Sequence, residues 1–134
     1  MRGRATAGAA TALVVLVGFA GGQASAHDVI YKSQVTLDDY GPVKPRVITN
    51  FFTGRVKSPQ GACRPDRKVK VYLVDAGPDT LIGTQQSEAD GKWYLGNDQV
   101  GPGDYYAKLI RRDIGQTLHD HLCKRARSDV LTVS

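Results

Sequence analysis

Residues 68–73 read Lys-Val-Lys-Val-Tyr-Leu, and this stretch carries the clearest structural pattern in the chain. Its three apolar side chains alternate with two lysines and a tyrosine. Strict alternation of this kind is typical of a β-strand that buries one face and exposes the other to water. We therefore predict a strand over residues 68–73 with Val69, Val71 and Leu73 in the core.

Comparable β-rich stretches lie on both sides of this strand. The expected strands cover residues 29–37, 47–56, 68–73, 81–85, 92–95, 105–109 and 130–133. Clusters of Gly, Pro, Asp and Ser separate them, and helical periodicity is almost absent. About seven short strands with turn residues between them predict an all-β fold, a single antiparallel β-sandwich of the prealbumin or immunoglobulin-like kind.

Two of the turn clusters support specific predictions. Residues 38–42 read Asp-Asp-Tyr-Gly-Pro and are expected to form a turn, while Pro42 and Pro45 exclude a central strand there. Asp90-Gly91 predicts a hairpin that joins the strands at 81–85 and 92–95, because glycine adopts a positive φ at little cost.

Two aromatic side chains are expected in the core. Trp93 offers the largest apolar area in the chain. Tyr105 follows Gly103 by two residues, which suits a corner tyrosine whose hydroxyl bonds back to a turn. The alternative for both is an exposed position that stacks on a sugar.

The N-terminal segment has the features of a secretory signal peptide. Arg2 and Arg4 precede an apolar run over residues 12–20, and Ala24-Ser25-Ala26 supplies the small residues that signal peptidase reads. The run is too short to span a bilayer, which needs roughly 20 residues. We expect a signal peptide at 1–26 and a secreted, extracellular domain at 27–134 that leaves the membrane after cleavage. The alternative is an uncleaved N-terminal anchor.

Both cysteines, Cys63 and Cys123, lie in the part of the chain that is expected to be exported. Two thiols in an oxidising compartment most simply form one disulfide. Free thiols or an intermolecular bridge are the alternatives.

Several short motifs resemble those of known secreted proteins. They occur in the order Phe52-Thr53-Gly54-Arg55-Val56, Asp90-Gly91-Lys92-Trp93 and Pro102-Gly103-Asp104-Tyr105-Tyr106-Ala107. The chain resembles small secreted actinobacterial-type proteins of unknown function. More distantly it is similar to transthyretin-like and carboxypeptidase-regulatory-like β-sandwich modules. The resemblance implies an extracellular accessory or binding module, and it brings no catalytic residues.

The basic residues gather around the two cysteines. The formal net charge of the chain is +5, and loss of a signal peptide that contains two arginines leaves +3, which does not indicate nucleic-acid binding. A disulfide would nevertheless bring two basic runs together. The predicted patch for an anionic ligand consists of Arg64, Arg67, Lys68, Lys124, Arg125 and Arg127. Its alternative is a set of solvated lysines and arginines that discourage pairing of strand edges.

The three histidines are the candidates for a metal site. His119 and His121 alternate with Cys123, but a cysteine in a disulfide cannot supply a thiolate ligand. We therefore expect no metal there. His27 becomes the first residue if cleavage follows Ala26, and its amino group and imidazole then form a chelating pair that Cu(II) favours.

No catalytic motif is present. Glu88 is the single glutamate, most aspartates lie in turns, and there is no G-x-S-x-G or phosphate-binding glycine loop. We expect a secreted non-enzymatic module without a cofactor, and a structural or binding role at the cell exterior. An extracellular polysaccharide, a wall polymer or a protein are the candidate partners. The alternatives are a copper-binding protein that uses His27 and an inhibitor or toxin-like effector that presents the loop at residues 111–121.

Overall fold

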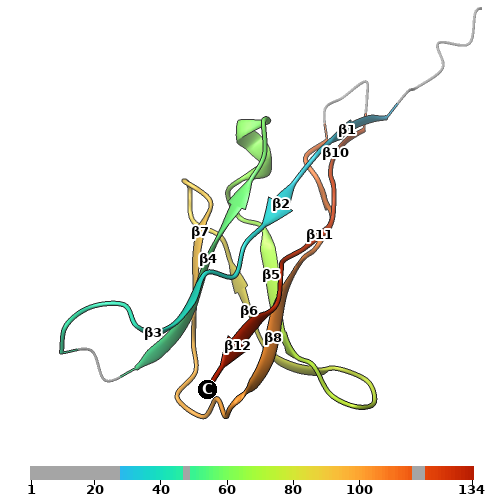
Figure 1. The fold of residues 1–134 in the computed structure, drawn as a ribbon. Helices are drawn as coiled ribbons and strands as arrows, with labels where there is room; N and C mark the ends of the chain where they lie inside the picture. Colours follow the sequence, from blue (N-terminus) through green and yellow to red (C-terminus); the bar gives the residue numbers. More distant parts are fainter. Residues whose placement is uncertain (1–27, 47–48, 116–119) are drawn as a thin grey trace, which may run out of the picture.

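The computed structural model describes residues 28–46, 49–115 and 120–134, so the predicted signal peptide lies outside the described residues. This part of the chain is all-β, with 12 strands in three sheets and one short 3-10 helix, η1, at Gly61–Cys63 (Figure 1). It contains no helix long and apolar enough to cross a membrane. The strands are β1 Val29–Tyr31, β2 Gln34–Val35, β3 Asp39–Pro42, β4 Asn50–Lys57, β5 Lys68–Leu73, β6 Thr80–Gln86, β7 Lys92–Gly96, β8 Gly103–Leu109, β9 Arg112–Asp113, β10 His121–Cys123, β11 Ala126–Arg127 and β12 Leu131–Val133.

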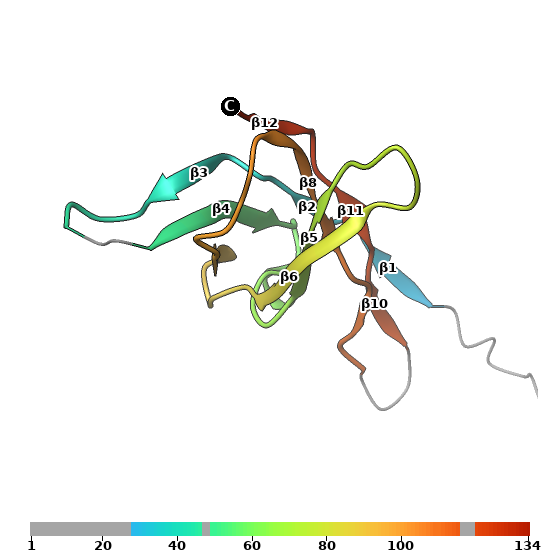
Figure 2. The same ribbon diagram turned by 90° about the horizontal axis from the view of Figure 1, so that it is seen from below.

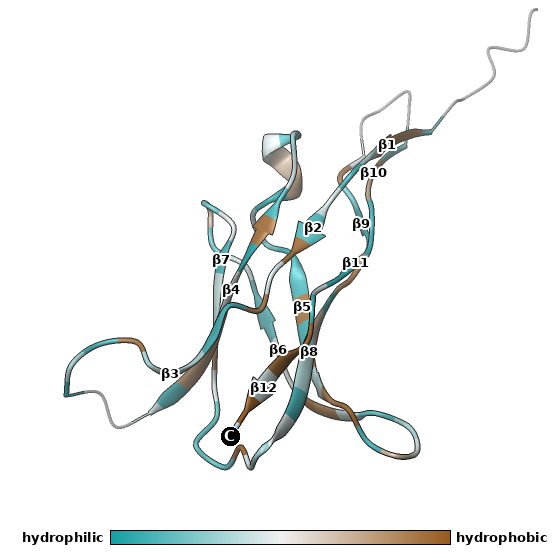
Figure 3. Cartoon of the chain, viewed as in Figure 1, coloured by the Kyte–Doolittle hydropathy of each residue, from teal (hydrophilic) through white to brown (hydrophobic). Residues whose placement is uncertain are grey.

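The first sheet is built around β5 and β8. Its strand order is β11-β8-β5-β6, and β12 also pairs with β8. The alternation predicted for residues 68–73 is confirmed, because Val69 and Val71 are fully buried while Lys68 is exposed. Figure 3 shows this alternation of hydrophobic and hydrophilic residues along β5. The pairing of β5 with β8 is antiparallel and places Val71 opposite Ala107.

The second sheet is centred on β4, with β2 and β3 on one side and β7 on the other. The prediction of a turn at residues 38–42 is wrong: Asp39–Pro42 forms strand β3, in which Tyr40 pairs with Phe52. The Tyr40 and Phe52 rings pack at 4.7 Å, and the Tyr40 hydroxyl donates to the Asn97 carbonyl. These contacts hold the segment extended. Strand β3 pairs with β4 and with no other described strand, so it lies at the sheet edge, in agreement with the expected exclusion of prolines from a central strand.

The inner faces of these two sheets pack on one another. Phe52 of β4 contacts Tyr105 of β8 at 5.0 Å between ring centroids, and Trp93 of β7 is fully buried beside them. The Tyr105 hydroxyl donates to the Gly101 carbonyl at 2.7 Å, which confirms the predicted corner tyrosine. Gly54 is required at the centre, because a Cβ there would lie 1.9 Å from the Thr36 carbonyl oxygen. The predictions of a core tryptophan and a core tyrosine are both confirmed.

The hairpin predicted at Asp90-Gly91 is wrong. Strand β6 pairs with β5, whereas β7 pairs with β4, so the chain passes from one sheet to the other between them. Figure 2, which views the molecule from below, shows β6 lying apart from β4 and its neighbour β3. Gly91 has a φ of +87°, and its carbonyl accepts from the Val56 amide at 2.7 Å. The turn residues were identified correctly, but burial of Trp93 against β4 determines which strand β7 joins.

The third sheet is small and lies at the end of the molecule farthest from the C-terminus (Figure 1). Its order is β1-β10-β9, with β1 parallel to β10 and β9 antiparallel to β10. The predicted disulfide is confirmed: Cys63 of η1 is bonded to Cys123 of β10, with 5.5 Å between their Cα atoms. The bridge therefore ties this small sheet to the chain that enters β5.

Candidate functional site

The structure separates the basic residues that the sequence placed in one patch. Lys124, Arg125 and Arg127 are exposed along β10 and β11 and the link between them. Lys68 is exposed on β5, opposite Gln86. Arg64 follows η1, where its Nε donates to the Ser58 carbonyl at 2.9 Å. Only part of the predicted patch therefore forms a common surface.

Arg67 does not belong to any surface patch, because its side chain is fully buried. Its Nη1 donates to the Cys63 carbonyl at 2.7 Å and to the Ser33 hydroxyl at 3.1 Å. Its Nη2 donates to the carbonyls of Ile110 at 3.0 Å and Lys124 at 2.9 Å. Both Nη atoms are engaged inside the protein, so Arg67 lies beneath the surface on which the predicted patch was expected.

The charge of Arg67 is retained in spite of burial. Desolvation, followed by repulsion from Arg112, lowers the pKa of Arg67 from 12.5 to about 10. The side chain is thus still protonated at neutral pH. Among the described residues the single salt bridge joins Lys92 to Asp90, so backbone carbonyl dipoles rather than a carboxylate stabilise the Arg67 cation.

Arg67 also positions the surface above it. Leu109 pairs with Ala126, and Arg112 pairs with Cys123, in the same antiparallel register. Between these two pairs the carbonyls of Ile110 and Lys124 turn to the Arg67 guanidinium instead of completing a ladder. The register places Ile110 level with Arg125 and Arg111 level with Lys124. Arg67 thus holds two cation-bearing segments side by side.

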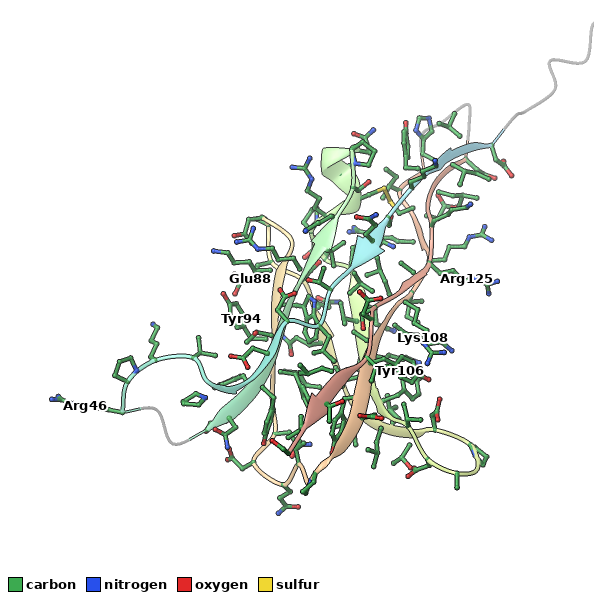
Figure 4. The ribbon with its side chains drawn as sticks, viewed as in Figure 1. Arg46, Glu88, Tyr94, Tyr106, Lys108 and Arg125 are labelled. Atoms are coloured by element: carbon green, nitrogen blue, oxygen red, sulfur yellow. A yellow bond between two sulfur atoms is a disulfide. The ribbon has the colours of Figure 1, made fainter. Side chains whose placement is uncertain are left out.

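Two adjoining hollows lie over these segments. The first has a volume of about 660 Å³ and is lined by Tyr72, Lys108, Leu109, Ile110, Arg111, Arg125, Ala126 and Arg127. The second has a volume of about 610 Å³ and is lined by Ile30, Arg111, Leu122, Cys123, Lys124 and Arg125. We call them together the basic groove, because the described residues of their linings include five cationic side chains and no carboxylate. Figure 4 shows Lys108 and Arg125 along one edge of the molecule, away from Glu88 and Tyr94.

Aromatic rings support two of the cations. Tyr72 and Tyr106 stack at 5.4 Å with an angle of 15° between their planes. The Arg127 guanidinium lies 3.7 Å from the Tyr106 ring centroid, and the Lys108 ammonium lies 5.5 Å from that of Tyr72. Cation–π contacts of this kind restrict the side chains and hold their charges at defined positions.

A hydrogen bond anchors this stack from the side. The Tyr106 hydroxyl donates to a carboxylate oxygen of Asp79 at 2.7 Å. This bond, the Asp75 backbone amide and the positive charges of Arg127 and Lys108 lower the pKa of Asp79. The same hydrogen bond, together with burial, raises the pKa of Tyr106. The carboxylate thus fixes the ring from outside the groove.

A different hollow of about 300 Å³ lies over β3, β4 and β7 and has a mixed lining. Asp38 and Asp39 there face Arg55 and Lys92 across the same space. Opposite charges at short range cancel much of the field that would attract a charged ligand. The basic groove is consequently the stronger candidate for a site.

Of the three histidines considered as metal ligands, one can be located. His121 lies in β10, where its Nδ1 is 2.9 Å from the Tyr31 hydroxyl. His27 and His119 lie outside the described residues. Residues 28–46, 49–115 and 120–134 contain no group of three or more His, Cys, Asp or Glu side chains that could hold a metal ion.

Two members of the basic groove, Lys108 and Arg111, were missed in the sequence. Lys108 lies on the predicted strand at 105–109, where it alternates with the buried Ala107 and Leu109. That alternation indicates an outward side chain and could have identified Lys108. Arg111 becomes part of the groove through the contacts of Arg67, which no local pattern reveals.

Comparison with known protein families, curated proteins and solved structures found no match.

Proposed function

We propose that this protein is a secreted, non-catalytic β-sandwich module that binds an anionic partner at the cell exterior through the basic groove. The observation that carries the proposal is the set of five cations, without a carboxylate, along the two adjoining hollows. Cations held in a concave surface focus their field and attract negative ligands. The packing of the β4 sheet on the β5 sheet supports the sandwich architecture.

The chemistry of the lining supports binding rather than catalysis. Arginine and lysine side chains donate hydrogen bonds to anions, and the rest of the described lining is aliphatic or aromatic apart from the disulfide cysteine Cys123. Tyr72 adds an apolar surface, and Lys108 and Arg127 are held by rings before any ligand arrives. Pre-organised cations reduce the entropy that binding would otherwise cost.

Retention on immobilised polymers tests this proposal. The disulfide-bonded protein is passed over polyanionic matrices and over a neutral polysaccharide matrix of the same density. We expect retention on the polyanions alone and elution by salt, because surface charges are screened within about 8 Å at physiological ionic strength. Passage through every matrix without delay, together with a reproducible turnover activity, would contradict the proposal.

Export is tested separately. We expect the protein to be recovered outside the cell membrane with His27 as its first residue. Fractionation followed by N-terminal sequencing measures both. A product that retains residues 1–26 in the membrane fraction would show an uncleaved anchor instead.

A second candidate function is copper binding through His27, and one specific observation favours it. Strand β1 runs parallel to β10 and places Val29 opposite His121. His27 lies outside the described residues and precedes Val29 by two residues in the sequence. An N-terminal amine, the His27 imidazole and His121 would together supply the nitrogen ligands that Cu(II) favours.

Copper titration distinguishes this candidate. The protein with His27 at its N-terminus is compared with His27→Ala, and d–d absorption reports the bound ion. Loss of tight Cu(II) binding in His27→Ala is expected under this function. A mature chain that begins at another residue would remove the chelating pair and with it the candidate.

A further inference from the structure

The two hollows of the basic groove are joined at a pair of arginines. Arg111 and Arg125 line both hollows, so each contributes to two neighbouring spaces. Each hollow, at about 660 and 610 Å³, has the volume of a small-ligand site. A ligand that fills both must therefore be longer than one compact molecule and must cross the Arg111–Arg125 junction.

The spacing of the cations points to a ligand with repeated charges. Lys108 and Arg111 are three residues apart on one segment, and Lys124 and Arg127 are three residues apart on the other. Three residues of extended chain span about 10 Å. One carboxylate, sulfate or phosphate group contacts cations at both ends of such a span only if both long side chains bend toward it. A linear polymer that carries an anion on successive units can pair with both cations while their side chains stay apart.

The surface between the cations is apolar. Ile110, Ala126 and Tyr72 contribute to the first hollow, and Ile30 and Leu122 contribute to the second. Ile30 is 55% exposed, so its side chain is open to a ligand in the second hollow. Aliphatic and aromatic surfaces contact the C–H faces of sugar rings, and forked guanidinium groups match the two oxygens of a carboxylate.

We propose that the basic groove binds a linear acidic polysaccharide in an extended form. Consecutive stretches of the polymer occupy the two hollows, and a carboxylate or sulfate at their junction pairs with Arg111 and Arg125. This inference rests on the proposed function and adds the class and length of the ligand. A polyphosphate shares the repeated charge but has no ring to contact the apolar surface. Nucleic acids, moreover, are held by several exposed aromatic platforms, and Tyr72 is the one aromatic side chain in the lining.

The test measures affinity against chain length. The disulfide-bonded protein is titrated with polygalacturonate, with its disaccharide and with galacturonate, and fluorescence anisotropy or calorimetry reports binding. We expect the affinity per ligand molecule to rise from galacturonate to the disaccharide and again to longer oligomers. It should level off at the length that fills both hollows. Polyphosphate of equal charge and a single-stranded oligonucleotide are expected to bind about tenfold or more weakly.

Matched variants place the binding in the groove. Arg111→Ala/Arg125→Ala removes the junction, and we expect it to lower the affinity for long polygalacturonate by about tenfold or more. Arg55→Ala/Lys57→Ala removes the same charge from β4 on the other sheet and is expected to leave the affinity unchanged. Circular dichroism of both variants confirms that each remains folded.

The outcomes separate the two proposals. If galacturonate binds as tightly as the polymer, or if polyphosphate or the oligonucleotide binds more tightly, the polysaccharide inference is wrong and the anionic-ligand function stands. If the control variant loses as much affinity as the junction variant, binding is a general charge effect and the inference is again wrong. If no anionic probe binds, the proposed function itself fails.

Discussion

The centre of the molecule and its disulfide end are held together by different interactions. At the centre, Trp93, Phe52 and Tyr105 meet between two sheets and are almost wholly buried. At the disulfide end, β1, β9 and β10 have only two or three residues each. The Cys63–Cys123 bridge ties β10 to η1, and the four hydrogen bonds of Arg67 hold the segments that flank these strands. Strands so short bury little apolar surface, so a covalent bond and a buried cation replace packing.

Trp93→Ala should show the largest effect, because it breaks the centre. We expect the free energy of unfolding to fall by about 4 kcal/mol, the usual cost of removing a large buried ring. Denaturant unfolding monitored by tyrosine fluorescence measures it. Trp93→Phe is the control and should cost much less, since the Trp93 indole N–H has no hydrogen-bond partner in the described structure. A loss in Trp93→Ala no larger than that of the half-exposed Val130→Ala would contradict a packed centre.

Removal of the disulfide should follow, with a more local effect. Cys63→Ala/Cys123→Ala opens a covalent loop with a sequence separation of 60, and we expect a loss of about 3 kcal/mol. Hydrogen exchange should rise first in β1, β9 and β10, while amides of β5 and β8 keep most of their protection. Uniform acceleration across all strands would mean that the two regions do not differ as described.

Arg67→Met sharpens the comparison further. It leaves the carbonyls of Cys63, Ile110 and Lys124 without their donor, and we expect a loss of about 2 kcal/mol, partly offset by removal of a buried charge. Arg67→Lys keeps the charge but cannot reach four acceptors with one ammonium, so it should not restore stability. Stability of Arg67→Lys equal to that of the unchanged protein would show that charge alone matters.

The smallest effect should come from the Asp79–Tyr106 hydrogen bond on the outer side of the centre. The pKa of Asp79 is lowered from 3.8, so its contribution is present above pH 3.8 and is lost as the pH falls through the lower folded-state value. The pKa of Tyr106 is raised from 10.0, so its contribution is present below pH 10 and is lost as the pH rises through the higher folded-state value. Asp79→Asn should therefore be less stable than the unchanged protein between these limits, with the difference shrinking in acid. A difference that is constant from acid to neutral pH would assign the effect to packing.

The parts of the fold that the sequence predicts are those set by alternation within one strand. The core positions of β4, β5 and β8, the corner hydroxyl of Tyr105 and the burial of Trp93 all follow from local pattern. The choice of partner strand does not follow from local pattern. Strand β7 pairs with β4, where Trp93 is buried, and not with β6 across the turn at Asp90-Gly91. Strand β3 was missed for a related reason: its turn-like residues are held extended by Tyr40 on Phe52.

The site was predicted only in part. Lys124, Arg125 and Arg127 follow Cys123 in sequence, and all three line the basic groove. Arg67 also follows a cysteine, but it is buried because it donates to three carbonyls and one hydroxyl group from other segments of the chain. The sequence does not distinguish an arginine that faces solvent from one that donates hydrogen bonds to buried carbonyls. The carbonyl acceptors come together only in the tertiary structure.

The parallel pairing of β1 with β10 bears on when the protein can fold. Tyr31 and His121, which contact each other across this pair, are 90 residues apart, and β8 receives the C-terminal strand β12 as a partner. Such high contact order gives slow folding, on the scale of milliseconds to seconds for all-β domains. The sheets are incomplete until the last residues of the chain are available. A chain of this topology would remain without its complete sheets until β12 is available, which would suit the export proposed above.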